Sequence, residues 1–145
     1  MKQTKKMKWM LYVSLALSVL VLLFLAYVYY PRKIIDLLPQ DFNDHSISIL
    51  GITGKGVTYQ LNKEQVKELE EVFAFYKARR KVFQKKYDKS IGFGRVLIEG
   101  TEDSILFFTE SDLSVNNMQY KVYGAKKMVA EIEEILKKAT KIELE

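Results

Sequence analysis

The side chains in this sequence that are best suited to acid and base chemistry are a group of carboxylates and one histidine. Two convergent carboxylates can act as general acid and general base, but the positions of these carboxylates are explained better by strand ends and turns. His45 is the only histidine and the chain contains no cysteine, which excludes His-based zinc clusters, His-oriented triads, disulfides and thiolate sites. We therefore expect no enzyme, no catalytic residue, no metal and no cofactor. The carboxylates in question are Glu99, Glu102, Asp103, Glu110 and Asp112.

Three short motifs approach known ligand-binding patterns without matching them. The run from Asp41 to His45 resembles the start of an oxygen-ligand metal loop, but Ser46 and Ile52 occupy the positions that require glycine and glutamate. The segments Gly54 to Gly56 and Gly92 to Gly94 lack the remaining residues of phosphate-binding or dinucleotide-binding loops. We interpret all three motifs as turns.

The strongest candidate for binding is a basic run from Lys77 to Lys89, which only Asp88 offsets. If a helix continues through this run, Lys77, Lys81 and Lys85 stack at i, i+4 spacing, which costs about 0.2 to 0.5 kcal/mol per pair unless an anion relieves it. The run therefore predicts a surface for anionic lipid or an anionic wall polymer. The alternative is a solvated helix end favoured by the helix dipole. The candidate residues are Lys77, Arg79, Arg80, Lys81, Lys85, Lys86 and Lys89.

A long apolar segment precedes all these residues and predicts a membrane anchor. Residues 9 to 30 contain no charged side chain, and about 22 residues at 1.5 Å rise match a hydrocarbon core of roughly 30 Å. Pro31 then ends the helix. Aromatic rings near both ends are expected at the two headgroup layers; they belong to Trp9, Tyr12, Tyr27, Tyr29 and Tyr30.

The charges that flank the anchor predict its orientation. Four lysines lie within residues 1 to 8, whereas Arg32 and Lys33 are the basic residues that closely follow the segment. The positive-inside rule then places residues 1 to 8 in the cytoplasm and the carboxy-terminal domain outside the plasma membrane. A cleaved signal peptide is the alternative, but the tyrosines after Ala26 make a poor cleavage site.

Two predictions about partners follow from this topology. Aromatic residues interleave with the basic run as they do on surfaces that stack nucleic-acid bases, but an external domain excludes nucleic acid. Ser14 and Ser18 form a small-xxx-small pair, which would support a weak homodimer through the anchor. A phosphate at Lys126 and Lys127, near the start of the last helix, is a further hypothesis; two exposed lysines are its alternative.

Beyond the anchor, the patterns predict a connector over residues 31 to 45 and one α+β domain over residues 46 to 145. Alternation predicts a hairpin of 46–52 and 57–61, then strands at 95–100, 104–109, 113–115 and 118–123. Asn62 and Gln65 form a capping box for a helix that we expect to end between Arg80 and Tyr87. A second amphipathic helix runs from Ala125 to Leu136. We expect about five antiparallel strands, in the order ββα-βββ(β)-α, with both helices on one face.

The connector has its own apolar pattern. Ile34, Ile35, Leu37 and Leu38 lie between Pro31 and Pro39, and a helix there must end by Leu38 because the residue before proline avoids the α region. We expect these residues to pack on the domain.

The layout of the chain resembles small membrane-anchored or lipoprotein-like domains of unknown function from Firmicutes. The resemblance rests on the lysine-rich start, the uninterrupted span, and the segments LLPQDFNDHSISILGITGKGVTYQL and SDLSVNNMQYKVYG. This chain lacks the lipidated cysteine of the lipoprotein members, and no functional residue carries over. The resemblance implies a Gram-positive cell envelope with anionic lipids and teichoic polymers.

We therefore expect a non-enzymatic, single-pass binding module of the cell envelope. A structural or immunity-type membrane protein that recognises protein partners is the alternative, and an enzyme that uses the carboxylates is a third, less favoured hypothesis.

Overall fold

The computed structural model describes residues 2–51, 57–83, 94–100, 104–107 and 111–143, and its chain divides into the units Met1–Tyr30 and Pro31–Glu145. The first unit is helix α1, Lys2–Tyr29. Its stretch Thr4–Tyr29 is long and apolar enough to cross a membrane, which confirms the predicted amino-terminal apolar helix. The helix ends one residue before Tyr30, and Pro31 follows, because proline lacks the N–H group that would continue it.

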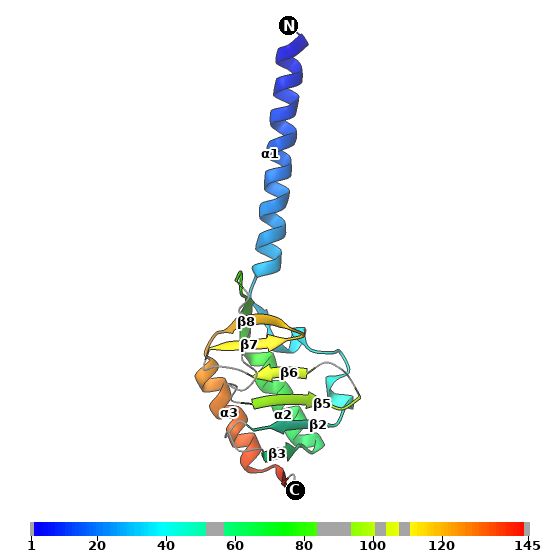
Figure 1. Ribbon diagram of the computed structural model, residues 1–145, viewed down its shortest axis with the longest axis vertical. Helices are drawn as coiled ribbons and strands as arrows, with labels where there is room; N and C mark the ends of the chain where they lie inside the picture. The colour runs from blue at the N-terminus through cyan, green and yellow to red at the C-terminus, as the bar shows by residue number, and fades with distance from the viewer. Residues whose placement is uncertain (1, 52–56, 84–93, 101–103, 108–110, 144–145) are drawn as a thin grey trace. The chain divides into compact units, whose positions relative to one another are not determined.

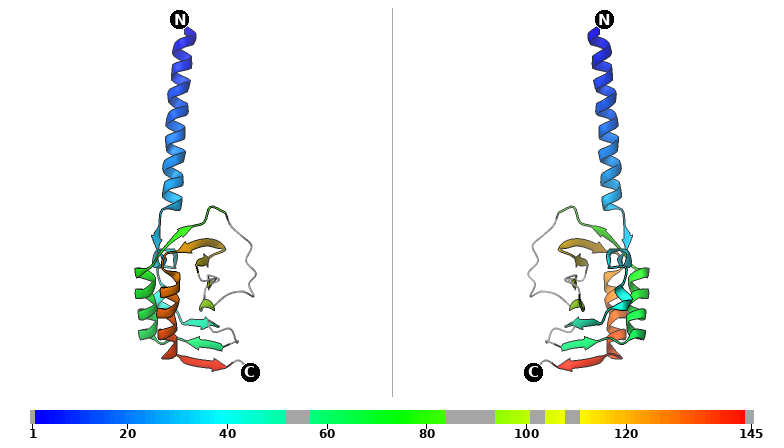
Figure 2. Two further views of the ribbon diagram at one scale, coloured as in Figure 1. Left: turned by 90° about the vertical axis from the view of Figure 1, so that its left-hand side faces the viewer. Right: turned by 90° about the vertical axis from the view of Figure 1, so that its right-hand side faces the viewer.

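Within the described residues of the second unit, nine strands form an antiparallel sheet in the order β1-β4-β8-β7-β6-β5-β2-β3-β9. Helices α2 and α3 lie side by side on one face of this sheet (Figures 1 and 2). The helices are α2, Lys63–Phe75, and α3, Ala125–Lys137. The strands are β1, Arg32–Lys33; β2, Ile47–Leu50; β3, Val57–Gln60; β4, Lys77–Arg80; β5, Gly94–Ile98; β6, Ser104–Phe107; β7, Asp112–Val115; β8, Met118–Val122; and β9, Thr140–Glu143.

The predicted α+β class and antiparallel pairing are confirmed, but the expected number of about five strands is too low. The hairpin β2–β3 and the run β5–β6–β7–β8 pair as the alternation predicted. Asn116 and Asn117 turn the β7–β8 hairpin with φ of 48° and 62°, the left-handed conformation that a tight hairpin turn requires. The strands that sequence patterns missed are β1, β4 and β9, which are short, charged and held by neighbours distant in the chain.

Helix α2 begins as predicted. The Asn62 side chain accepts a hydrogen bond from the backbone of Gln65, and the Gln65 side chain accepts one from the backbone of Asn62, both at 2.9 Å. The buried Gln65 also donates to the carbonyl of Lys138 at 2.9 Å. One glutamine therefore satisfies orphan backbone groups at the start of α2 and at the end of α3.

The predicted end of α2, between Arg80 and Tyr87, is wrong. The helix stops at Phe75, Tyr76 adopts an extended conformation, and residues 77 to 80 form strand β4. Arginine, lysine and alanine are good helix formers, but pairing of β4 with β8 on one side and with β1 on the other satisfies the same backbone groups. Tertiary pairing has overridden local propensity here.

Helix α3 matches its predicted span and buries the predicted stripe. Ala125, Met128, Ile132, Ile135 and Leu136 are buried, as a period near 3.6 residues requires. Gly124 precedes the helix with φ of 74°. A Cβ atom there would lie 3.3 Å from the Tyr76 ring, so both backbone conformation and space favour glycine.

Residues 31 to 45 belong to the same compact unit as the sheet. A 3-10 helix spans Ile34–Leu37, and Leu38 is already extended. This confirms that a helix here ends by the residue before Pro39. Ile34, Leu38 and Phe42 are buried in the core, and the ring of Phe42 meets that of Phe73 edge to face at 6.0 Å. The segment therefore covers α2 on the side away from α3.

We expect Asn62→Ala to lower the free energy of unfolding by about 1 kcal/mol, because the mutation removes one half of the capping box. Chemical denaturation of the full chain in detergent, followed by circular dichroism, measures this change. Lys63→Ala, at the neighbouring exposed position, serves as the control and should have little effect. Equal losses for the two variants would contradict a specific role for the cap.

Candidate functional site

The described part of the basic run lies on strand β4 and the residues after it. Lys77 and Arg79 are exposed on the same face of the strand, whereas Arg80 is partly buried and its guanidinium lies 3.2 Å from the sulfur of Met118. Lys81 forms an ion pair with Asp112 at 2.6 Å. The stacking of Lys77 and Lys81 on a helix therefore does not occur. Lys85, Lys86 and Lys89 lie outside the described residues.

Strand pairing adds two lysines to this surface that the sequence patterns did not indicate. Lys33 of β1 pairs directly with Lys77, and Lys121 of β8 pairs directly with Arg79. Paired residues point to the same side of a sheet, with Cβ atoms about 5 Å apart. Lys33, Lys77, Arg79 and Lys121 are all exposed, and together they form what we call the basic edge.

The basic edge has an energetic cost in the free protein. Like charges directly opposite each other in a sheet destabilise the pairing, and here two such pairs adjoin. Lys121 also lies directly opposite Asp112 of β7, which offsets part of this cost. A further positive charge, Lys81, is compensated by Asp112. The sequence patterns did not predict the two cationic pairs, because strand register is fixed by the tertiary fold. In the sequence, Lys33 and Lys77 are separated by the hairpin β2–β3 and by helix α2.

Exposed apolar side chains follow the same strand. Val82 is 62% and Phe83 is 83% exposed. Because Lys81 donates a backbone hydrogen bond to Gln119 of β8, these two residues leave the sheet beside the β7–β8 hairpin. Positive charge with a protruding aromatic ring is a combination typical of surfaces that meet the membrane interface.

The anchor residues occupy both ends of helix α1. Trp9 and Tyr12 lie in its first half, Tyr27 and Tyr29 in its last turn, and Tyr30 directly after it. The hydroxyl of Ser18 donates to the carbonyl of Ser14 at 2.9 Å, so this polar group is satisfied within the helix. The proposed contact of Ser14 and Ser18 with a second copy stays a prediction.

The carboxylates and the histidine do not converge in the described part of the chain. His45 Nε2 lies 2.9 Å from Asp41 Oδ2, and this hydrogen bond holds the pKa of the exposed Asp41 carboxyl below its usual range. Asp112 forms an ion pair with Lys81, and the backbone N–H of Glu99 donates to the carbonyl of Ser46. Glu102, Asp103 and Glu110 lie outside the described residues, as do residues 54 to 56 and 92 to 93.

No group of three or more metal-ligating side chains occurs among the residues that the structure describes. Residues 42 to 44, within the sequence that resembled a metal loop, form a 3-10 turn. Lys126 and Lys127 are exposed in the first turn of α3, and the Lys127 ammonium lies 4.0 Å from Glu131.

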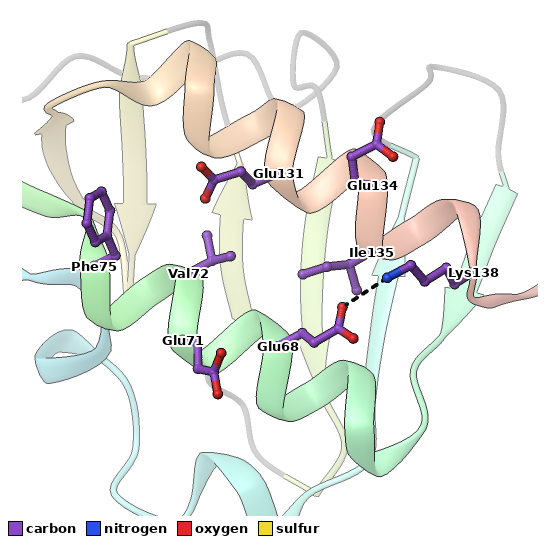
Figure 3. A pocket seen from close by; sticks show the side chains of 8 residues that line it. All are labelled: Glu68, Glu71, Val72, Phe75, Glu131, Glu134, Ile135 and Lys138. Carbon is purple, nitrogen blue, oxygen red and sulfur yellow. Dashed lines mark ion pairs between the residues drawn. The ribbon is translucent and has the colours of Figure 1, made fainter.

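A groove of about 360 Å³ that is open to solvent lies between helices α2 and α3, on the side away from the sheet (Figure 3). Val72 and Ile135 provide its apolar floor, and Phe75 stands at one end (Figure 3). Lys138 is at the other end, 3.7 Å from Glu68. The remaining lining residues are Glu71, Glu131 and Glu134. Sequence patterns did not indicate this groove, because its residues come from two helices that are far apart in the chain.

Tyr76 fixes one of these carboxylates. Its hydroxyl donates to Glu131 at 2.9 Å. Burial of the ring, together with Glu131, raises the pKa of Tyr76 to about 12. The phenol therefore stays protonated and remains a donor throughout the physiological range.

Comparison with protein-family models, with curated proteins and with solved structures gives no match for this chain.

We expect Tyr76→Phe to lower the free energy of unfolding by roughly 1 kcal/mol at pH 8, because the hydrogen bond to Glu131 is lost. The raised pKa means that the Tyr76 contribution is complete below pH 10 and is lost as the pH rises from about 10 to about 12. The difference between wild type and variant should therefore shrink at alkaline pH. Thermal unfolding of both proteins from pH 8 to 11 measures it; a constant or growing difference would contradict the assignment.

Proposed function

We propose that this chain is a non-enzymatic, single-pass membrane protein whose external domain binds an anionic partner of the cell envelope through the basic edge. The observation that carries this proposal is the register of β1, β4 and β8, which gathers Lys33, Lys77, Arg79 and Lys121 on one exposed surface. An anionic partner relieves the repulsion between the paired cations.

Chain connectivity supports a lipid headgroup as this partner. Lys33 is three residues after Tyr30, so their Cα atoms are at most roughly 10 Å apart. That distance is about one Debye length at physiological salt. If α1 spans a bilayer with Tyr30 at the headgroups, Lys33 stays within that distance of them, and Lys77 lies on the neighbouring strand.

The expected energies are sufficient for a stable contact. A lysine or arginine near an anionic lipid surface contributes about 1 kcal/mol, so the four cations supply several kcal/mol at low salt. An anionic wall polymer carries the same phosphate chemistry and is the second source of this ligand. A contact of this kind weakens as ionic strength rises.

The proposed orientation rests on the distribution of lysines. Lys2, Lys5, Lys6 and Lys8 precede the apolar stretch, and positive charges of this density are retained on the cytoplasmic side. The basic edge then belongs to the external leaflet.

We expect Lys33 and Lys77 to react with an amine-acylating reagent about threefold more slowly in nanodiscs containing phosphatidylglycerol than in phosphatidylcholine nanodiscs, because anionic headgroups cover them. About 0.5 M NaCl should remove most of the difference. Mass spectrometry of the labelled full chain measures each lysine separately. A soluble poly(glycerol phosphate) added to phosphatidylcholine nanodiscs distinguishes the polymer from the lipid.

The chain contains its own controls for this experiment. Lys63 and Lys67 lie on α2, and Lys141 lies on β9 at the opposite edge of the sheet; all three are exposed. Equal slowing at these positions would show a general effect of the anionic surface and would argue against the basic edge.

We expect external protease to remove a carboxy-terminal tag from intact protoplasts, because the domain is proposed to lie outside. Immunoblotting with a second tag at the amino terminus should show a retained anchor fragment. Protection of the carboxy-terminal tag until lysis would reverse the orientation and turn the basic edge toward cytoplasmic lipid.

A further inference from the structure

We infer that the groove between α2 and α3 binds a basic segment of a partner protein that inserts an apolar side chain next to Phe75. This inference is independent of the proposed function, because the groove and the basic edge share no residue.

The apolar part of the groove is unusual for a solvated helix pair. Phe75 is 72% exposed, although it ends a helix whose other phenylalanine, Phe73, is fully buried. Its ring rests edge to face on the Tyr76 ring, with centroids 5.1 Å apart, and thus has a supported position. Val72 and Ile135 continue the apolar surface along the groove (Figure 3). A supported, exposed aromatic ring beside aliphatic side chains is typical of a protein-binding hot spot.

The charges around this apolar floor specify the partner. Glu68 and Glu71 line the groove from α2, and Glu131 and Glu134 line it from α3. Lys138, the cation among the lining residues, is paired with Glu68, and Glu134 is paired with Lys137 outside the groove. Glu131 also lies 4.0 Å from the ammonium of Lys127. Four carboxylates still outnumber these three lysines, and Glu71 has no cation partner among the described residues, which favours lysine or arginine in the bound segment.

Two of the carboxylates are especially suited to this role. Glu131 is oriented by the hydroxyl of Tyr76, so little side-chain entropy is lost when a cation binds it. Glu71 has neither a hydrogen bond nor an ion pair to any other residue that the structure describes. Glu131 extends from α3 on the side of Phe75, whereas Glu71, one turn before Phe75 on α2, points away from α3 at the outer side of the groove (Figure 3).

The shape of the groove favours a peptide segment. A volume of about 360 Å³ is at the low end for small-molecule sites, which also enclose most of their ligand. This groove is open along its length, so a helix or an extended segment fits it better. Carboxylates repel anionic lipid headgroups, so a lipid surface is not the partner that we infer for this groove.

A second copy of the chain is the competing occupant, since its basic edge also carries lysines. Contact between a groove and a different surface is heterologous and generates open chains unless the rotation closes. We therefore assign the groove to a different protein.

The experiment uses the full chain in phosphatidylcholine nanodiscs and a fluorescent peptide of about 14 residues with one central phenylalanine among lysines and serines. Anisotropy gives its Kd, with protein-free nanodiscs as blank. We expect about tenfold weaker binding for Phe75→Ser and about fivefold weaker binding for Glu71→Gln combined with Glu131→Gln. The glutamine at 131 retains an acceptor for Tyr76.

Matched controls distinguish binding of the peptide at the groove from general attraction to exposed rings and carboxylates elsewhere on the domain. Phe83→Ser removes another exposed ring, and Glu64→Gln combined with Glu133→Gln removes the same charge from exposed helix positions outside the groove. These variants should bind as wild type does. Equal weakening in controls and groove variants, or equal binding of a peptide with glutamate in place of lysine, would overturn the inference. Self-association of the chain that Phe75→Ser abolishes, without peptide binding, would assign the groove to a second copy.

Discussion

The buried side chain of Tyr76 is the point on which the arrangement of the domain depends. Its backbone N–H donates to Val72 and closes α2, and its carbonyl accepts from Ile34 and holds the segment after the anchor. Its hydroxyl reaches α3 at Glu131. Three elements therefore converge on one aromatic residue, and burial of its ring supplies the hydrophobic energy, about 2 kcal/mol for a side chain of this size, that favours this convergence.

The end of α2 at this residue determines both candidate surfaces. Because the helix stops, residues 77 to 80 are released to pair with β8 and with Arg32–Lys33, and the basic residues become an edge of the sheet. The same stop leaves Phe75 as the last helical residue, exposed at the end of the α2–α3 groove. Positive charge is thereby concentrated on a sheet edge, whereas glutamates outnumber lysines on α2.

Anchoring changes how strong such surfaces need to be. A domain tethered to a bilayer by a few residues meets the headgroups at an effective concentration in the millimolar range or above. If α1 anchors the chain in this way, each cation of the basic edge needs to contribute only modestly, and the role we propose for the edge is to orient the domain more than to recruit it. The groove differs in this respect, because a soluble or separately anchored partner gains nothing from the tether of this chain. The affinity of the contact that we propose there would come from Phe75 and the carboxylate of Glu131.

The sequence by itself determined the features that depend on near neighbours in the chain. The apolar span, the capping box of Asn62 and Gln65, the Asn116–Asn117 turn and the stripe of α3 are all set by interactions over a few residues, and each could be predicted. The tertiary structure alone decided that Lys77–Arg80 is a strand, that Lys33 and Lys121 join it, and that Phe75 and Glu131 line one groove. These depend on pairing energies between residues far apart in the chain, which outweigh a helix propensity of a few tenths of a kcal/mol per residue and leave no periodic signal in the sequence.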